Sequence, residues 1–284
     1  MIINHNMNAM NANRNMAQNV NALGKSTEKL SSGLRINRAG DDAAGLSISE
    51  KMRAQINGLN QASRNSEDAV SLIQTAEGAL NETHSILQRM RELATQAAND
   101  TNVTIDRNSI DAELKQLSEE ITRIGEQTQF NTQNVLNGGL TNATASSTQG
   151  IDLNFQVGAN QGQSIKVTFS AMNSNTLGVS HGAGNLSVGS HEKATATIST
   201  INAAIEKVST ERSKYGAVQN RLEHTIANVD NAAENLQSAE SRIRDVDMAK
   251  EMMTYSKHNI LQQAAQSMLA QANQQPQQVL QLLG

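Results

Sequence analysis

The chain has 284 residues and a net charge of −4, and 37% of its residues are hydrophobic while only 2% are aromatic. With no Trp, three Phe and two Tyr, it is not expected to form a large globular core, and thin helical seams suit its composition better. The absence of cysteine excludes disulfides, thiol catalysis and cysteine-based metal sites. The small net charge gives no broad electrostatic attraction to nucleic acid or to an anionic membrane.

The first residues do not have the pattern of a targeting segment. Residues 1–10 lack a basic stretch followed by an apolar one, so no cleaved secretory signal is expected. No run of about 18 apolar residues occurs, so no transmembrane helix is expected either. The only proline is Pro276, which leaves the preceding chain free to form long helices.

Residues 2–34 predict a helix with a sparse apolar stripe, whose members are mostly three or four positions apart. Asparagine fills many of the remaining positions and is a poor helix former, so this helix should need a partner. The stripe consists of Ile3, Met7, Met10, Ala17, Val20, Leu23, Leu30 and Leu34.

The helical pattern is interrupted near Gly40, and a second helix begins just after this point. Gly40 suits the left-handed position that closes a helix. Asp41 or Asp42 can cap the next helix, near the positive end of its dipole. Together with Gly45, these residues predict an elbow between two helices. The two aspartates could also form a cation site with Glu50, but helix capping explains them more simply.

The strongest periodic signal lies between residues 62 and 97, where apolar or small residues alternate steps of four and three. This 3.5-residue period is typical of a coiled-coil seam. Residues 99–102 break it and residues 110–124 resume it, which predicts a second helix folded back antiparallel. Gly58 and Gly78 could each mark a close approach or a tolerated defect. The seam consists of Ala62, Ser66, Ala69, Ile73, Ala76, Leu80, Thr83, Leu87, Met90, Ala94 and Ala97.

Residues 151–170 predict a β-hairpin, because apolar residues alternate on both sides of a Gly-containing turn at 158–162. A lone hairpin is unstable in water, so it should lie against the helices. Residues 141–150 and 171–196 are rich in Ser, Thr, Asn and Gly and have no period, so we expect them to be exposed loops.

Residues 198–273 return to a helical pattern and end in a broad apolar face that is rich in methionine. The chain is therefore predicted to be mainly α, a long antiparallel coiled-coil or helical-bundle rod with a small β-hairpin and paired N- and C-terminal helices. These terminal helices expose too many apolar residues to be stable alone, so we expect self-association with ordering coupled to binding. The C-terminal residues assigned to this role are Met252, Ile260, Leu261, Met268, Leu269, Val279, Leu280, Leu282 and Leu283.

No motif of catalysis, cofactor binding or metal binding is present. The six His are scattered without a His-Glu-x-x-His pair, and neither a phosphate-binding Gly-x-x-x-x-Gly-Lys loop nor Gly-x-Ser-x-Gly occurs. Asp245 and Asp247 alternate with Arg242 and Arg244, and we interpret them as ion-paired positions on one helix. The sequence thus favours a structural protein over an enzyme.

Several long segments resemble a known family. Residues 28–46, which read EKLSSGLRINRAGDDAAGL, are similar to the N-terminal signature of bacterial flagellin. The chain is most similar to the short flagellins of Gram-positive bacteria, without large variable outer domains. The other matching segments are residues 72–80, 87–93, 216–226, 240–251 and 270–280.

The resemblance implies a subunit that polymerises into the flagellar filament for swimming motility, after export through the flagellar type III channel to the cell exterior. Residues 1–43 would form an N-terminal inner-core helix and connecting elbow. Residues 44–235 would form the outer-core rod with its hairpin. Residues 236–284 would form the C-terminal inner-core helix.

The resemblance also implies partners. These are other copies of the chain, the export apparatus, a secretion chaperone, the filament cap and the hook-filament junction proteins, with neither nucleic acid nor membrane among them. A vertebrate Toll-like receptor would recognise the family pattern that falls on Arg89, Leu93 and Glu113.

Two alternative functions fit parts of the pattern. A hook-filament junction protein shares the terminal helices but tends to diverge from the signatures quoted above. A secreted coiled-coil effector or adhesin would stay monomeric or form small oligomers, whereas a flagellin would form long filaments when seeded.

Overall fold

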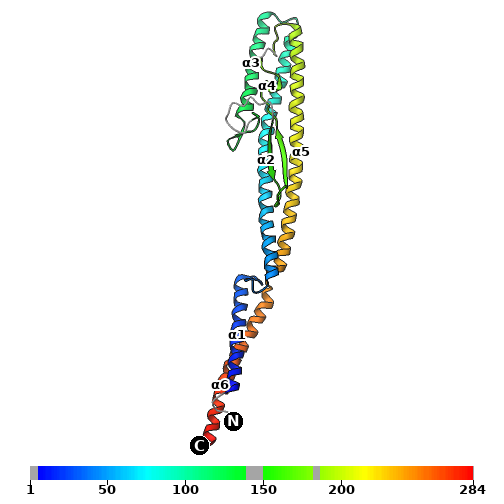
Figure 1. Ribbon diagram of the computed structural model, residues 1–284. Helices are drawn as coiled ribbons and strands as arrows, with labels where there is room; N and C mark the ends of the chain where they lie inside the picture. Colours follow the sequence, from blue (N-terminus) through cyan, green and yellow to red (C-terminus); the bar gives the residue numbers. More distant parts are fainter. Residues whose placement is uncertain (1–5, 139–149, 182–185, 284) are drawn as a thin grey trace. The chain divides into compact units, whose positions relative to one another are not determined.

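The computed structural model describes residues 6–138, 150–181 and 186–283, with side chains up to residue 275. Contacts divide the chain into two compact units, a terminal unit of residues 1–56 and 234–284 and a central unit of residues 57–233. The elements, labelled in Figure 1 where there is room, are α1 (Met7–Ser32), α2 (Ala43–Ala97), α3 (Thr104–Gln127), β1 (Gln129–Phe130), β2 (Gln133–Asn134), β3 (Ile151–Gln156), β4 (Ser164–Phe169), α4 (Ser174–Leu177), α5 (His191–Arg244) and α6 (Met248–Leu283).

In the central unit, α5 runs beside α2, and α3 folds back along another side of α2 (Figure 1). Each of the eleven residues of the predicted 62–97 seam is no more than 1% exposed, so the coiled-coil prediction is confirmed. Ion pairs link these helices at the edges of the buried seam. The Arg89 guanidinium lies 3.0 Å from the Glu113 carboxylate between α2 and α3, and Arg212 of α5 lies 3.7 Å from Glu77 of α2.

The predicted hairpin is present, with β3 and β4 antiparallel from Ile151 opposite Phe169 to Gln156 opposite Ser164. Its apolar face packs into the core, because Ile165, Val167 and Phe169 are all buried and the Phe169 ring centroid lies 5.2 Å from that of Tyr215 in α5.

The hairpin turn also settles the meaning of the two helical glycines. A Cβ at Gly58 would lie 2.8 Å from the Cβ of Ala159, whereas a Cβ at Gly78 would meet nothing within 4 Å. Gly58 therefore permits a close approach between α2 and the turn of the hairpin, and Gly78 does not serve this purpose.

The prediction of an exposed loop over residues 171–196 is wrong. Its described part places eight residues in the interior, from α4, from the irregular segments on either side and from the start of α5, and α5 begins at His191 rather than near residue 198. The segment has no period because most of it is irregular backbone, and Ser118 of α3 donates a 2.8 Å hydrogen bond to the carbonyl of Val179. The other expected loop, residues 141–150, lies outside the described residues except for Gly150. The buried residues of 171–196 are Ala171, Met172, Ser174, Leu177, Val179, Leu186, Val188 and Ala194.

The end of α1 also differs from the prediction. The helix stops at Ser32, and Gly33 adopts the left-handed conformation (φ 71°) that was assigned to Gly40, with its N–H donating to the carbonyl of Lys29. Gly40 lies instead in a turn without a positive φ. The two glycines are seven residues apart, and the predicted apolar stripe, whose last member is Leu34, ends close to the observed end of the helix.

A second, smaller strand pair escaped the sequence patterns. Strands β1 and β2 pair antiparallel around a turn in which Asn131 and Thr132 both have positive φ. Two-residue strands are too short to show an alternation of apolar and polar residues.

Candidate assembly surface

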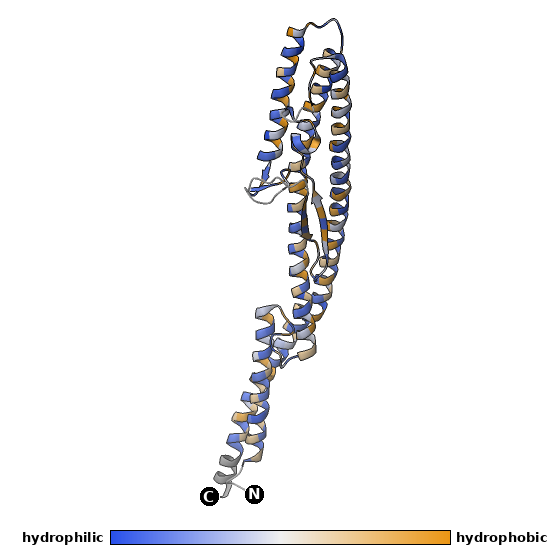
Figure 2. Ribbon diagram, turned by 45° about the horizontal axis from the view of Figure 1, so that its top comes forward, coloured by the Kyte–Doolittle hydropathy of each residue, from blue (hydrophilic) through white to orange (hydrophobic). Residues whose placement is uncertain are grey.

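In the terminal unit, α1 and α6 pack against each other in opposite directions, and hydrophobic residues are scattered among hydrophilic ones along them (Figure 2). Asn6 secures the start of α1 in two ways. Its side-chain oxygen accepts from the N–H of Ala9 and caps α1, while its amide nitrogen donates to the carbonyl of Ala272 at 2.8 Å. The predicted pairing of the N- and C-terminal helices is thereby confirmed.

Most residues assigned to self-association are exposed or half-buried in the isolated subunit. Leu23, Leu30, Leu34 and Leu269 are half-buried. Ile3 lies outside the described residues, as do the side chains of Val279, Leu280, Leu282 and Leu283. The exposed members are Met7 (69%), Met10 (61%), Val20 (42%), Met252 (51%), Ile260 (66%), Leu261 (39%) and Met268 (60%).

Three further exposed apolar residues belong to the same unit but were not among the predicted site residues. They are Ile48 at the start of α2 and Met248 and Met253 on α6. Met248 and Met253 both lie on the broad apolar face of residues 248–272, and Met253 is next to the predicted Met252. The sequence pattern could therefore have identified these two methionines as part of the surface. Ile48 gave no such signal, because it belongs to the pattern of α2.

Exposed and buried apolar residues are divided unevenly between the two units. Among the described residues, ten of the twelve exposed large hydrophobic side chains belong to the terminal unit, and only Val103 and Ile105 belong to the central unit. Conversely, Ile36 and Ile56 are the only buried hydrophobic residues described in the terminal unit. Since full burial of a large apolar side chain contributes roughly 1.5–3 kcal/mol, the terminal unit leaves much of this free energy unused.

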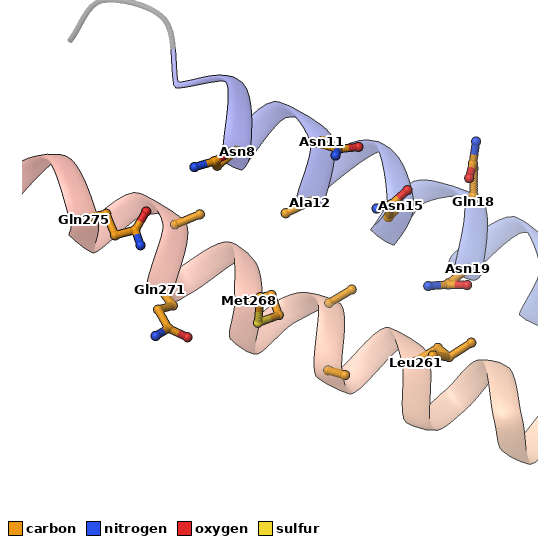
Figure 3. A pocket seen from close by; sticks show the side chains of 13 residues that line it. Asn8, Asn11, Ala12, Asn15, Gln18, Asn19, Leu261, Met268, Gln271 and Gln275 are labelled. Carbon is orange, nitrogen blue, oxygen red and sulfur yellow. The ribbon is translucent and has the colours of Figure 1, made fainter. Parts of the chain in front are cut away.

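A groove runs between α1 and α6 in the terminal unit, as Figure 3 shows from close by. The α1 side presents side-chain amides, and the α6 side presents apolar and small residues followed by further amides. A surface of this kind can accept apolar side chains while its amides donate and accept hydrogen bonds. The lining residues are Asn8, Asn11, Ala12, Asn15, Gln18, Asn19, Leu261, Ala264, Ala265, Met268, Gln271, Ala272 and Gln275.

The predicted elbow is a hydrogen-bonded loop between α1 and α2. Asp42 caps α2, since its Oδ1 accepts from the N–H of Gly45 at 2.9 Å. Asp41 instead closes the loop, because its Oδ2 accepts from the N–H groups of Arg38 and Asn37, at 3.0 and 3.2 Å. These two hydrogen bonds, that from Arg38 first, lower the pKa of the Asp41 carboxyl below its ordinary value.

The elbow loop is also bonded to the segment between α5 and α6, and we call the contacts of residues 33–35 with residues 243–246 the clasp. The N–H of Arg35 donates to the carbonyl of Arg244, the N–H of Val246 donates to the carbonyl of Gly33, and Leu34 forms a β-bridge with Asp245. The Arg35 guanidinium donates twice to the carbonyl of Ile243, from Nη2 at 2.6 Å and from Nε at 3.1 Å. Sequence patterns could not reveal this clasp, because its partners are about 210 positions apart.

Two ion pairs within the terminal unit reinforce the clasp. Arg244 Nη1 lies 2.6 Å from Glu50 Oε1, and Arg53 Nη2 lies 2.7 Å from Glu240 Oε1, so each pair joins the start of α2 to the end of α5. Arg244 and Glu240 are largely buried, with side chains 12% and 14% exposed.

The predicted ion pairing within residues 242–247 is therefore wrong. Arg244 pairs with Glu50 instead, and Arg242 donates to the hydroxyl of Ser238. Asp245 accepts from the hydroxyl of Ser241, and Asp247 caps α6 by accepting from the N–H of Lys250. The helix ends at Arg244, so the two acids do not lie on the helix that carries the arginines.

The three residues assigned to receptor recognition lie in the central unit. Arg89 and Glu113 are about half exposed and paired at 3.0 Å, and this pairing raises the pKa of the Arg89 guanidinium. Leu93 is only 2% exposed and belongs to the buried core. The structure thus brings the two charged residues together at the surface and leaves the leucine beneath it.

Among the described residues, no three His, Asp or Glu side chains gather as a metal site would require. The same part of the chain has no helix with the length and apolarity needed to cross a membrane.

Comparison with known proteins shows similarity over the whole chain. The family model described as the bacterial flagellin N-terminal helical region matches residues 3–141, and the flagellin C-terminal helical region matches residues 198–283. Flagellin from Halalkalibacterium halodurans is 59% identical over 283 residues, and flagellin from Bacillus subtilis strain 168 is 51% identical over 303 residues. Each alignment covers 100% of both chains.

A solved structure supports the fold. A protein from Vibrio parahaemolyticus that is provisionally assigned as a flagellar hook-associated protein has a TM-score of 0.60 and 14% identity. The match covers 72% of this chain and 100% of that one, and at this identity it shows a likeness of fold alone.

Proposed function

This chain belongs to the bacterial flagellin family and is a structural subunit of the flagellar filament, and we propose that it assembles through the apolar residues of α1 and α6. Flagellins polymerise with copies of themselves, and the filament that they form is extracellular. The full-length identity to two flagellins, at 59% and 51%, favours this role over that of a hook-filament junction protein.

One observation supports the proposal above all others. The exposed large apolar side chains gather on the terminal unit, which has almost no buried core of its own, whereas the central unit has a continuous core. Soluble monomers rarely keep large exposed apolar patches unless these meet a partner. Contacts with neighbouring subunits would bury these residues and order both terminal helices more firmly.

We further propose that different segments form different parts of the filament, as the family resemblance implies. Residues 1–43 and 236–284 form the inner core of the filament, and residues 44–235 form the outer core. The clasp formed by Arg35 with Ile243 and Arg244 joins the segment that follows α1 to the segment that precedes α6, so that both terminal helices enter the assembly as one piece. Asp41 and Asp42 hold the elbow loop that carries Arg35.

The remaining partners are proposed on family grounds. The subunit leaves the cell through the flagellar type III export apparatus with a secretion chaperone, and it then meets the hook-filament junction and the filament cap. A vertebrate Toll-like receptor contacts the exposed Arg89–Glu113 pair. Leu93, being buried, contributes to that site by supporting the helix surface above it.

A matched pair of substitutions tests assembly through α6. Ile260 in the terminal unit is 66% exposed, and Ile105 in the central unit is 76% exposed, so replacing either by serine should leave the free subunit folded. Ile260→Ser should remove about 1.4 kcal/mol or more of apolar burial at the contact between subunits. Since about 1.4 kcal/mol corresponds to a factor of ten, the critical concentration for seeded polymerisation should rise about tenfold or more. Ile105→Ser should leave that concentration unchanged within about twofold.

Sedimentation of filaments at a series of subunit concentrations gives both values. Equal effects of the two substitutions, or none from Ile260→Ser, would contradict the proposal that α6 is the assembly surface.

A further inference from the structure

The methionines of this chain are distributed in a way that the fold does not require. Among the described residues, Met90 and Met172 are buried in the central unit, and Met16 and Met52 of the terminal unit are half-buried. The other described methionines all lie exposed in the terminal unit. They are Met7, Met10, Met248, Met252, Met253 and Met268, which are 48–69% exposed.

These exposed sulfurs lie within the candidate assembly surface. Met252 and Met253 line a shallow hollow on α6 together with Ile260 and Leu261. Met268 lines the groove between α1 and α6, where Figure 3 shows it on the α6 side. The thioethers are thus accessible to solvent in the free subunit at the places where neighbouring subunits would cover them.

Methionine has a defined oxidation chemistry. One molecule of hydrogen peroxide transfers one oxygen atom to the sulfur, so an S–O bond forms, the O–O bond breaks and one water is released. The sulfur loses two electrons and the peroxide gains them. The product, methionine sulfoxide, is polar and chiral, and it disrupts methionine-rich interfaces.

We propose that the exposed methionines of α1 and α6 form a peroxide-sensitive modification site that blocks polymerisation of the free subunit and that assembly itself protects. This inference rests on the proposed assembly surface. A sulfoxide in the hollow at Met252 and Met253 must be buried against apolar side chains when a neighbour docks, and a buried polar group without a hydrogen bond is unfavourable. Once subunits are assembled, the same sulfurs are covered and react slowly.

The test compares oxidised and untreated full-length subunits. Free subunits are treated with hydrogen peroxide, the peroxide is removed with catalase, and sulfoxides are located by peptide mass spectrometry. Sulfoxides should form first at the six exposed positions and last at Met90 and Met172. The critical concentration for seeded polymerisation should rise at least about tenfold, in line with the burial of unsatisfied polar groups.

A volume-conserving variant identifies the sulfurs responsible. Met252→Leu, Met253→Leu and Met268→Leu combined keep the apolar surface, because Met and Leu exchange with little cost. Measured against its own untreated sample, this variant should lose much less assembly after peroxide treatment than the unsubstituted chain does. A second variant with Met90→Leu and Met172→Leu should remain as sensitive as the unsubstituted chain.

Reversal separates this modification from general damage. A pair of methionine sulfoxide reductases, one for each sulfoxide epimer, should restore polymerisation of the oxidised subunit. Preformed filaments given the same peroxide dose should show at least fivefold less sulfoxide at Met252, Met253 and Met268 than free subunits do.

Three results would overturn the inference. The first is that fully oxidised subunits assemble as well as untreated ones. The second is that peroxide lowers the assembly of the variant with three α6 substitutions as much as that of the unsubstituted chain. The third is that filaments and free subunits are oxidised to the same extent. Failure of this inference can be told apart from failure of the proposed function. The Ile260→Ser comparison uses no oxidant and tests assembly through α6 by itself, whereas the comparison of oxidised with untreated subunits tests the effect of the sulfoxides.

Discussion

Asp41 shows how one side chain can hold the backbone of a loop in place. Its carboxylate accepts hydrogen bonds from the N–H groups of Arg38 and Asn37, and these favour the charged form. The pKa is therefore lower in the folded chain than in the unfolded chain. The stabilisation is fully present above the unfolded value of 3.8 and is lost as the pH falls through the lower folded value.

The elbow loop should consequently loosen in acid. An NMR titration should place the midpoint of Asp41 below 3.8, and the amides of Asn37 and Arg38 should lose protection as this carboxyl is protonated. In Asp41→Asn the loss of protection with acid should disappear, because no proton is taken up. A midpoint at or above 3.8 would show that the two hydrogen bonds do not hold in solution.

Gly45 and Gly40 have different importance in the elbow, although both were assigned to it from the sequence. A Cβ at Gly45 would lie 2.5 Å from Asp42 Oδ2 and 2.8 Å from Ile36 Cδ1, whereas a Cβ at Gly40 would meet nothing within 4 Å. Gly45→Ala should destabilise the terminal unit by about 1–3 kcal/mol through overpacking. Gly40→Ala should change its stability by less than about 0.5 kcal/mol.

Hydrogen exchange at the amides of residues 36–48 measures both variants. The yield of filaments should fall in Gly45→Ala and stay unchanged in Gly40→Ala. Equal behaviour of the two variants would mean that the packing of Ile36 against the first turn of α2 is unimportant.

At the scale of elements, the sequence period predicted the buried residues of a long helix and failed where buried residues lie on irregular backbone. The seam of α2 repeats every 3.5 residues and was predicted residue by residue. The buried segment around α4 has no period, since Val179 and Val188 reach the core from irregular backbone. The clasp between Arg35 and Ile243 is a contact between distant segments, which no local pattern encodes.

The α2 seam should set the stability of the central unit. Leu80 is 0% exposed in the core, so Leu80→Ala should destabilise this unit by about 2–5 kcal/mol. Leu261→Ala removes the same atoms from a residue that is 39% exposed in the terminal unit, and it should leave the main unfolding transition unchanged. Thermal unfolding followed by circular dichroism measures both, and a similar shift for each would contradict the assignment of the core.

At the scale of the whole molecule, composition predicted thin helical seams, and the apolar residues of the terminal helices predicted a part of the chain that orders only with neighbours. With 2% aromatic residues, its core consists mainly of Leu, Ile, Val, Met and Ala from the helices and the hairpin, with Phe169 and Tyr215 among them, and this core lies in the central unit. The terminal helices retain exposed apolar residues that only other molecules can cover. The sequence could predict this surface but not the clasp that joins the segment after α1 to the segment before α6.

Hydrogen–deuterium exchange of free subunits and of filaments tests this account most directly. In free subunits, amides of α1 and α6 should exchange at least about a hundredfold faster than those of the α2 seam, because little apolar burial supports these helices. In filaments, α1 and α6 should become protected, whereas protection of residues 62–97 should change little. Equal protection of α1 and α6 in the two states would contradict assembly through the terminal helices.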